Sequence, residues 1–343
     1  MRKLLNTLYV TTPDAWLARD GETIVVREGD EERIRIPIHN LESVICYGRQ
    51  GASPALMQMC AERDVALSFM SENGKFLARV VGAVSGNVLL RRQQYRLADS
   101  PADSTAYARG SIFGKVANSR SVLQRALRDH GAAHGMPGVR EAVNRMADQL
   151  TRLESVGALD ELRGVEGEAA RTYFGVFNEL IVCQKEDFVF DGRNRHPPRD
   201  RVNALLSFLY ALLMNDVRSA LEAVGLDPAV GFLHRDRSGR PGLALDMMEE
   251  LRPYLADRLA LTLINLQQVN SKGFDTRQPQ GVRMDDNTRK AVIGAWQTRK
   301  REDITHPYLK EKIPIGLIPH VQALLLARTI RGDLDAYPAF LYK

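Results

Sequence analysis

The hydrophobic pattern of the chain changes its period near residue 82, and this change constrains the fold more than any other feature. Before it, short alternating or β-branched segments such as TLYVTT (7–12) and SVICYG (43–48) are separated by turn dipeptides such as Asp20-Gly21, which is typical of hairpins. After it, long segments repeat apolar residues every three or four positions and several end at glycine, as amphipathic helices do.

The pattern predicts an α+β fold with two domains, a small β-rich domain followed by a larger all-α domain. The 343 residues exceed what one hydrophobic core usually organises. We place a β-rich domain at 1–82, with one helix that begins after Ser53, a linker at 83–100 and the α-helical domain at 101–343. A hydrophobic content of 44% with 26% charged residues excludes a disordered chain.

Cysteine usage and the apolar runs argue against export and against a membrane span. The three cysteines lack CxxC spacing, which fits neither a disulfide framework nor a zinc cage. The apolar N-terminal stretch is broken at Asn6, too early for a secretory segment. The longest apolar run, 205–214, is about half of the roughly 20 residues that a bilayer requires. We therefore expect a cytoplasmic protein without membrane contact.

The positive charge of the chain is concentrated in its helical part. The net charge is +5, and residues 1–84 hold 10 Lys+Arg against 11 Asp+Glu, whereas the remainder holds 37 against 31. Basic side chains lie in three clusters, at 185–201, 235–240 and 289–301. Such clusters neutralise phosphates, although each alone is often a solvated face. They favour DNA as the partner of the helical part.

The stretch GFLHRDRSGRPGLALDMMEELRP (231–253) places acids at the border of an apolar helix face. In a helix that begins near Leu243, Asp246 and Glu249 lie three residues apart on one side. Acids so close to a core are expected to be paired or to hold a metal. His234 precedes them across a loop that is able to fold back, although a lone histidine is often structural.

A further acid, Glu166, lies between Gly164 and Gly167. Each glycine inside a helix costs about 1 kcal/mol relative to alanine, so two glycines here indicate that something must approach the backbone closely. The other interpretation is a solvated acid near the start of a helix. Two carboxylates and one imidazole from separate segments suit Mg²⁺ or Mn²⁺. A metal bound there stabilises charge on a phosphoryl oxygen, which again calls for an anionic substrate.

Three motifs in this order resemble the CRISPR-associated integrase family, which inserts DNA during spacer acquisition. They are LRGVEGEAARTYF (162–174), FDGRNRHPPRDRVNALLSFLYALL (190–213) and the stretch 231–253, behind a β-rich N-terminal domain. The opening MRKLLNTLYVTTPDAWL (1–17) is similar to the variant that accompanies type I-C systems. The resemblance extends over essentially the whole chain.

The resemblance implies roles for individual residues. It makes Glu166, His234 and Glu249 both the catalytic residues and the ligands of Mg²⁺ or Mn²⁺, with Asp246 in support or at a second metal. Tyr210 would touch DNA or serve as a core tyrosine, and Glu250 is interpreted as a solvated charge. The basic clusters, and not the resemblance, supply the other predicted DNA-binding residues, which are Arg193, Arg195, Arg235, Arg237 and Arg240.

The implied activity is that of a metal-dependent DNA endonuclease and integrase. A prespacer 3′-hydroxyl would attack a phosphodiester at the boundary between the leader and the repeat of a CRISPR array. The implied assembly is a homodimer formed through the β domains, joined by a small ferredoxin-like CRISPR partner on double-stranded DNA. Two alternatives stay open: a housekeeping nuclease or junction resolvase that only cuts, and a helical DNA-binding scaffold without chemistry.

Overall fold

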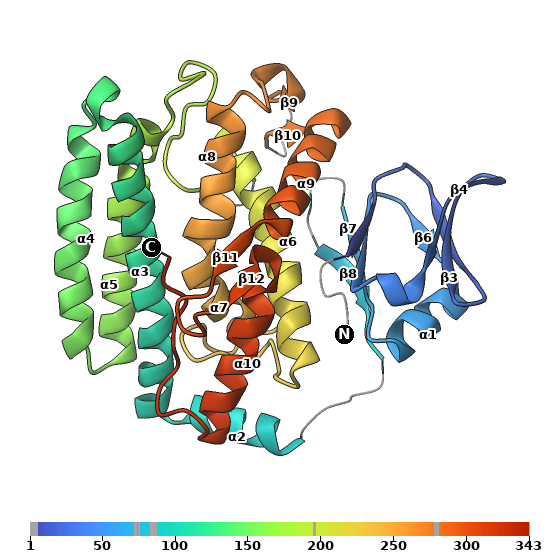
Figure 1. The fold of residues 1–343 in the computed structure, drawn as a ribbon, viewed down its shortest axis with the longest axis horizontal. Helices are drawn as coiled ribbons and strands as arrows, with labels where there is room; N and C mark the ends of the chain where they lie inside the picture. The colour runs from blue at the N-terminus through green and yellow to red at the C-terminus, as the bar shows by residue number, and fades with distance from the viewer. Residues whose placement is uncertain are drawn as a thin grey trace. The chain divides into compact units, whose positions relative to one another are not determined.

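The computed structural model describes residues 6–71, 74, 76–82, 88–194, 197–277 and 281–342. The chain divides into two compact units, Met1–Ser85 and Gly86–Lys343. The first unit is β-rich and the second is mostly helical (Figure 1). The predicted α+β class, with strands first and helices after them, is therefore confirmed.

Two four-stranded sheets form the first unit. In one, with the order β1-β5-β7-β8, the first three strands are parallel and β8 is antiparallel to β7. In the other, with the order β4-β3-β2-β6, β2, β3 and β4 form an antiparallel ladder and β6 pairs parallel to β2. The strands are β1 Thr7–Val10, β2 Trp16–Asp20, β3 Thr23–Glu28, β4 Glu31–Pro37, β5 Ser43–Tyr47, β6 Gly51–Ala52, β7 Ala66–Met70 and β8 Phe76–Val80.

Local signals in the sequence explain the turns and the helix of this unit. Gly21 and Gly29 connect β2 to β3 and β3 to β4 with φ of 58° and 59°, values that glycine adopts without strain, so these predicted hairpins are confirmed. Helix α1 (Pro54–Glu62) begins after Ser53, whose Oγ accepts a hydrogen bond from Leu56 N at 3.2 Å. This is the predicted N-cap. The buried side of α1 packs with the apolar side chains of both sheets.

Nine helices span the described part of the second unit. The π-helical turn η3 (Pro253–Asp257) joins α7 to α8, and two short strand pairs, β9 with β10 and β11 with β12, lie between the later helices, so the unit is not purely α-helical. The helices are α2 Val88–Asp99, α3 Pro101–His134, α4 Pro137–Ser155, α5 Leu159–Gly175, α6 Arg201–Ala223, α7 Gly242–Arg252, α8 Arg258–Asn265, α9 Asp286–Arg301 and α10 Ile318–Arg331. The short elements are η1 Ile38–Asn40 in the first unit and η2 Phe177–Leu180, η4 Ser271–Gly273, η5 Ile315–Leu317, β9 Phe274–Asp275, β10 Arg283–Met284, β11 Asp303–Thr305 and β12 Lys312–Pro314 in the second.

The segment predicted as a linker, 83–100, is largely a helix of the second unit. Helix α2 covers Val88–Asp99, and its Gln94 side chain is fully buried. The Gln94 Nε2 donates hydrogen bonds to the backbone oxygens of Asp227 and Val230, both at 2.8 Å. A buried amide needs such partners, and they lie more than 130 residues away, where local sequence does not reveal them.

Helix α3 is the longest helix and contacts α2, α4, α5 and α7 (Figure 1). Its Gly114 faces α7 so closely that an added Cβ would lie 2.8 Å from the Glu250 Cβ. Glycine at this position therefore sets the distance between α3 and α7. These two helices, together with α5, carry the site described below.

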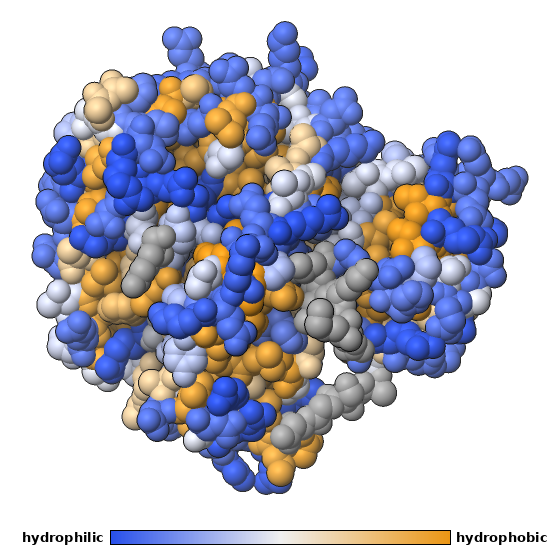
Figure 2. All heavy atoms as spheres, in the orientation of Figure 1, coloured by the Kyte–Doolittle hydropathy of each residue, from blue (hydrophilic) through white to orange (hydrophobic). Residues whose placement is uncertain are grey.

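Helix α6 is long and apolar enough to cross a membrane by length and composition alone, and 61% of its most apolar window is buried inside the unit. A core helix of a globular protein has the same properties. On the face shown in Figure 2, hydrophilic residues cover much of the helical unit and apolar residues show between them in separate groups. The absence of membrane contact stays a prediction.

We predict opposite effects for two glycine substitutions on α3. Gly114→Ala should lower the free energy of unfolding by about 1–3 kcal/mol, because the new methyl group collides with α7. Gly131→Ala should raise it by up to about 1 kcal/mol, because its Cβ would meet only Leu127 at ordinary distance, 3.8 Å, and alanine favours a helix. Thermal denaturation followed by circular dichroism measures both. Equal effects at the two positions would contradict the close packing of α3 on α7.

Candidate active site

Helices α3, α5 and α7 bring two of the predicted acids to one positive charge. The Lys115 Nζ of α3 forms ion pairs with the Glu166 Oε1 of α5 and with the Glu249 Oε2 of α7, the latter at 2.6 Å. The two acids are 83 residues apart in the sequence, and the structure joins them as predicted. Lys115 was not predicted; its only signal is a single lysine among small and apolar residues in SIFGKVAN (111–118).

Glu249 is the most deeply buried member of this group, with 3% of its surface exposed. Its Oε1 accepts a hydrogen bond from Arg252 Nη1, one turn further along α7. Burial alone would raise the pKa of Glu249, but the charges of Arg252 and Lys115 outweigh it and hold the pKa well below its usual range. A charge on His234 would lower the pKa of Glu249 further. Glu249 is therefore ionised at neutral pH.

The loop that carries His234 folds back onto α7 through Asp246. The Asp246 Oδ2 accepts hydrogen bonds from the backbone N–H groups of Phe232 and Leu233, at 2.6 and 3.0 Å. Its Oδ1 lies 2.9 Å from the His234 backbone N and 2.6 Å from His234 Nδ1. Because the carboxylate accepts, Nδ1 carries a proton, and Nε2 is the ring nitrogen left to bind a metal, as in carboxylate–histidine–metal arrangements. The predicted fold-back is confirmed.

Two glycines permit this close return of the chain. A Cβ added to Gly231 would lie 2.5 Å from the Gly242 carbonyl carbon, and one added to Gly242 would lie 2.6 Å from the His234 oxygen. Both contacts are with backbone atoms, which have no side-chain freedom to move away. Gly231 and Gly242 therefore allow the two ends of the loop to touch.

Glu250 was interpreted as a solvated charge, and this interpretation is wrong. Its side chain is fully buried, and it accepts hydrogen bonds from Gln322 Nε2 at 3.0 Å, Tyr337 Oη at 2.5 Å and Phe340 N at 2.7 Å. Burial raises its pKa to about 7, although these three bonds oppose the shift. The partners come from α10 and from the C-terminal segment, 72 to 90 residues away, so the pattern of α7 alone does not reveal them.

The other predicted DNA-binding residues lie in different surroundings. Arg235 and Arg237 are exposed and Arg240 is partly exposed; the Arg235 Nη1 also donates to the Ala98 backbone oxygen at 3.1 Å. Arg193 donates to Asn203 Oδ1 at 2.6 Å and lies over the Tyr210 ring, 5.0 Å from its centroid. Arg195 lies outside the described residues. DNA contact by any of these side chains stays a prediction.

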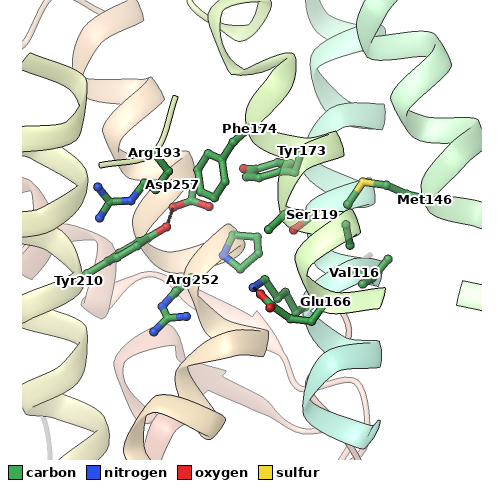
Figure 3. Close-up of a pocket in the computed structure, with 14 residues that line it drawn as sticks. Val116, Ser119, Met146, Glu166, Tyr173, Phe174, Arg193, Tyr210, Arg252 and Asp257 are labelled. Carbon is green, nitrogen blue, oxygen red and sulfur yellow. Dashed lines mark hydrogen bonds and ion pairs between the residues drawn. The ribbon is translucent and has the colours of Figure 1, made fainter. Parts of the chain in front are cut away.

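A cavity of about 190 Å³ adjoins the acids (Figure 3). Lys115, Glu166 and Arg252 line it together with Arg193, Tyr210 and Asp257, and Figure 3 shows Tyr210 and Asp257 pointing toward each other. The Tyr210 Oη donates to Asp257 Oδ1 at 2.7 Å, and Arg252 lies over the Tyr210 ring, 5.3 Å from its centroid. The cavity therefore combines aromatic rings with basic and acidic side chains.

Among the described residues, no three His, Cys, Asp or Glu side chains are gathered as a group ready to hold a metal ion. Two of the three predicted ligands, Glu166 and Glu249, contact the Lys115 ammonium instead, and the Glu249 Oε2 that faces it is buried and accepts no well-aligned hydrogen bond. An anionic oxygen in that situation suits a cation. The two carboxylates thus offer oxygen donors to a cation at the place where the lysine charge lies.

Comparisons with known proteins place the whole chain in one family. The model of the CRISPR associated protein Cas1 matches residues 8–298. The CRISPR-associated endonuclease Cas1 1 of Chlorobaculum tepidum is 48% identical over 343 residues, and the CRISPR-associated endonuclease Cas1 2 of Rhodospirillum rubrum is 52% identical over 347 residues; each match covers both chains completely. The chain belongs to the Cas1 family.

Two solved structures share the fold of this chain over nearly its whole length. A Cas1 protein from Thermotoga maritima matches with a TM-score of 0.81 and 21% identity, over 95% of this chain and 97% of the other. A casposase bound to an integration product matches with a TM-score of 0.84 and 21% identity, over 98% and 94% of the two chains. The β-rich first unit and the mostly helical second unit are thus features of the Cas1 fold.

We predict that Asp246→Asn loosens the histidine loop of this Cas1 protein. An asparagine amide has one acceptor oxygen, so hydrogen bonds now made by one of the two carboxylate oxygens are lost, at a cost of about 1–3 kcal/mol. The midpoint of thermal denaturation should fall accordingly. Asp236→Asn, in the exposed part of the same loop, is the control and should leave the midpoint unchanged. Equal midpoints for both variants would rule out this role of Asp246.

Asp257 predicts a dependence of stability on pH. Burial raises its pKa from 3.8 to about 6, against the hydrogen bond from Tyr210 and the charges of Arg193 and Arg252. Because the folded state holds the proton more tightly, this stabilisation is complete below about pH 4 and is lost as the pH rises through 6. We therefore compare the free energy of unfolding of Asp257→Asn with that of the wild type at two pH values. The variant minus the wild type should be about 2–3 kcal/mol larger at pH 7 than at pH 4. Urea denaturation at several pH values measures the difference, and a constant offset would show that Asp257 does not titrate in this way.

Proposed function

We propose that this Cas1 protein joins DNA strands at a divalent metal site formed by Glu166, His234 and Glu249. The observation that carries the proposal is the convergence of two carboxylates, from α5 and α7, on a single positive charge. His234 adds an imidazole whose Nδ1 is held by Asp246. Oxygen donors with one imidazole suit Mg²⁺ and Mn²⁺.

The metal, when bound, would lower the pKa of the attacking hydroxyl and stabilise charge on the phosphoryl oxygen. The side chains around the donors position the reactants. Asp246 fixes the imidazole tautomer, and Arg252, held between Glu249 and the Tyr210 ring, supplies a positive charge at the cavity. Phosphoryl transfer depends mainly on such positioning and charge stabilisation.

The reaction that we propose is a transesterification. A prespacer 3′-hydroxyl oxygen forms a bond to phosphorus at the boundary between leader and repeat, and the bridging oxygen of the cut strand leaves with a proton. Water in place of the hydroxyl makes the same site an endonuclease. The names of the curated relatives, CRISPR-associated endonucleases, support the cutting activity, and the casposase bound to an integration product shares the fold.

The assembly that we propose is a homodimer formed through the β-rich unit, with double-stranded DNA on the helical unit. Exposed apolar side chains on the strands of the first unit support the dimer, among them Trp16, Ile34 and Leu77. A small ferredoxin-like CRISPR partner would join two dimers; a solved complex that matches this chain contains Cas1 with Cas2. We further propose a type I-C system and a cytoplasmic location.

The proposal predicts the loss of strand joining in three variants. Glu166→Ala, His234→Ala and Glu249→Ala should each reduce joining by about a hundredfold or more in Mn²⁺, because each removes a metal ligand. Glu168→Ala is the control, because Glu168 is exposed and pairs with Arg152. The assay follows the insertion of a duplex with 3′-hydroxyl ends into a plasmid that carries a leader and a repeat.

The outcomes of this assay separate the alternatives. A wild-type protein that nicks the plasmid without joining would be a nuclease only. A protein inactive with Mg²⁺ and with Mn²⁺ would be a DNA-binding scaffold. Full joining by any one of the three variants would remove that residue from the metal site.

A further inference from the structure

We propose that Lys115 is a further catalytic residue, which occupies the metal position in the metal-free protein and moves to a phosphate of the DNA when the metal binds. The inference rests on the proposed function, since it concerns the same site. Its starting point is that both ion-pair partners of the Lys115 ammonium, Glu166 and Glu249, are the carboxylates proposed as metal ligands.

The charges at the site balance without a metal. Glu166 and Glu249 carry two negative charges, and Lys115 and Arg252 carry two positive charges in direct contact with them. A divalent ion added to this group would face two cations at close range in a buried place, where repulsion is strong. One cation must therefore leave the carboxylates, or an anion must enter with the metal.

Lys115 is the cation able to leave. Arg252 is held at two points, by Glu249 Oε1 and by the Tyr210 ring, and a guanidinium packed on a ring is rigid. The Lys115 ammonium ends a flexible stem of four carbons, and its ion pairs among the described residues are with the two carboxylates that the metal would neutralise. A metal held by Glu166 and Glu249 would thus remove the attraction that holds Lys115 in place.

The cavity of about 190 Å³ beside Lys115 offers the ammonium a second position. Lys115 already lines this cavity together with Arg193 and Arg252 (Figure 3), and in this proposal the cavity holds the reacting strand. A phosphodiester there supplies the negative charge that the released ammonium needs. The metal would release Lys115 to the phosphate, and the phosphate would draw Lys115 away from the metal position. Binding of the metal and binding of DNA should therefore each strengthen the other.

The test measures the dissociation constant of Mn²⁺ for the full chain without DNA, from the electron paramagnetic resonance signal of free Mn²⁺. Lys115→Met should bind Mn²⁺ at least about tenfold more tightly than the wild type. In the wild type the Lys115 ammonium blocks the site for a fraction of the time, and the apparent affinity for Mn²⁺ falls in proportion to the fraction of open sites. Joining by Lys115→Met at saturating Mn²⁺ should nevertheless fall, because the phosphate loses its contact. Adding duplex DNA should tighten Mn²⁺ binding in the wild type and do so less in the variant.

Lys312→Met is the matched control, because Lys312 is exposed and pairs only with Asp303 in the described residues; its affinity for Mn²⁺ should equal that of the wild type. Lys115→Gln repeats the test with a neutral side chain that donates hydrogen bonds, in case the methionine variant does not fold. Equal or weaker Mn²⁺ binding by a folded Lys115 variant would overturn the inference. Glu249→Ala separates this from a failure of the proposed function: if that variant binds Mn²⁺ like the wild type, the metal site itself is wrong.

Discussion

A buried carboxylate held between two cations is the interaction on which the site of this Cas1 protein depends. Glu249 lies almost fully inside the helical unit, with Arg252 on one oxygen and Lys115 on the other. An isolated charge at this depth would cost several kcal/mol, so the helices that deliver the cations must pack at fixed distances. Gly114 permits that spacing between α3 and α7, and Lys115, the next residue, reaches across to α5.

The C-terminal segment stabilises the same helix from its other side. Glu250 binds Tyr337 and the Phe340 backbone, while the Asn118 Nδ2 of α3 donates to the backbone oxygens of Glu250 and Phe340, at 2.7 and 2.8 Å. These bonds join α3, α7 and the C-terminal segment that contains Tyr337 and Phe340 into one buried polar network. Networks of this kind are costly when a partner is lost, so the C-terminal segment is part of the support of the site.

The sequence predicts the parts of this structure that rest on local pattern. The change of period near residue 82, the turns at Gly21 and Gly29, the cap at Ser53 and the fold-back of the loop before α7 all depend on neighbouring residues. Local pattern raised Glu166, His234, Asp246 and Glu249 as candidates, and the resemblance of three motifs selected Glu166, His234 and Glu249 from them. Their joint role as metal ligands stays a proposal.

What the sequence does not reveal is decided by contacts between distant segments. Local sequence predicts Glu250 as an exposed acid because its three hydrogen-bond partners lie 72 to 90 residues further along the chain. It predicts α2 as a linker because the hydrogen-bond partners of Gln94 lie near residue 230. No charged residue lies within four positions of Lys115 in α3 to mark it. In each case a buried polar group is satisfied by long-range packing, which no local periodicity encodes.

The central claim is that Glu166, His234 and Glu249 hold one divalent ion. Anomalous X-ray diffraction from crystals of the wild-type chain grown with Mn²⁺ tests it most directly. We expect one strong manganese peak about 2.1 Å from a carboxylate oxygen of Glu166, from one of Glu249 and from His234 Nε2. A peak at any other set of side chains, with Glu166 and Glu249 still paired to Lys115 at saturating Mn²⁺, would contradict it.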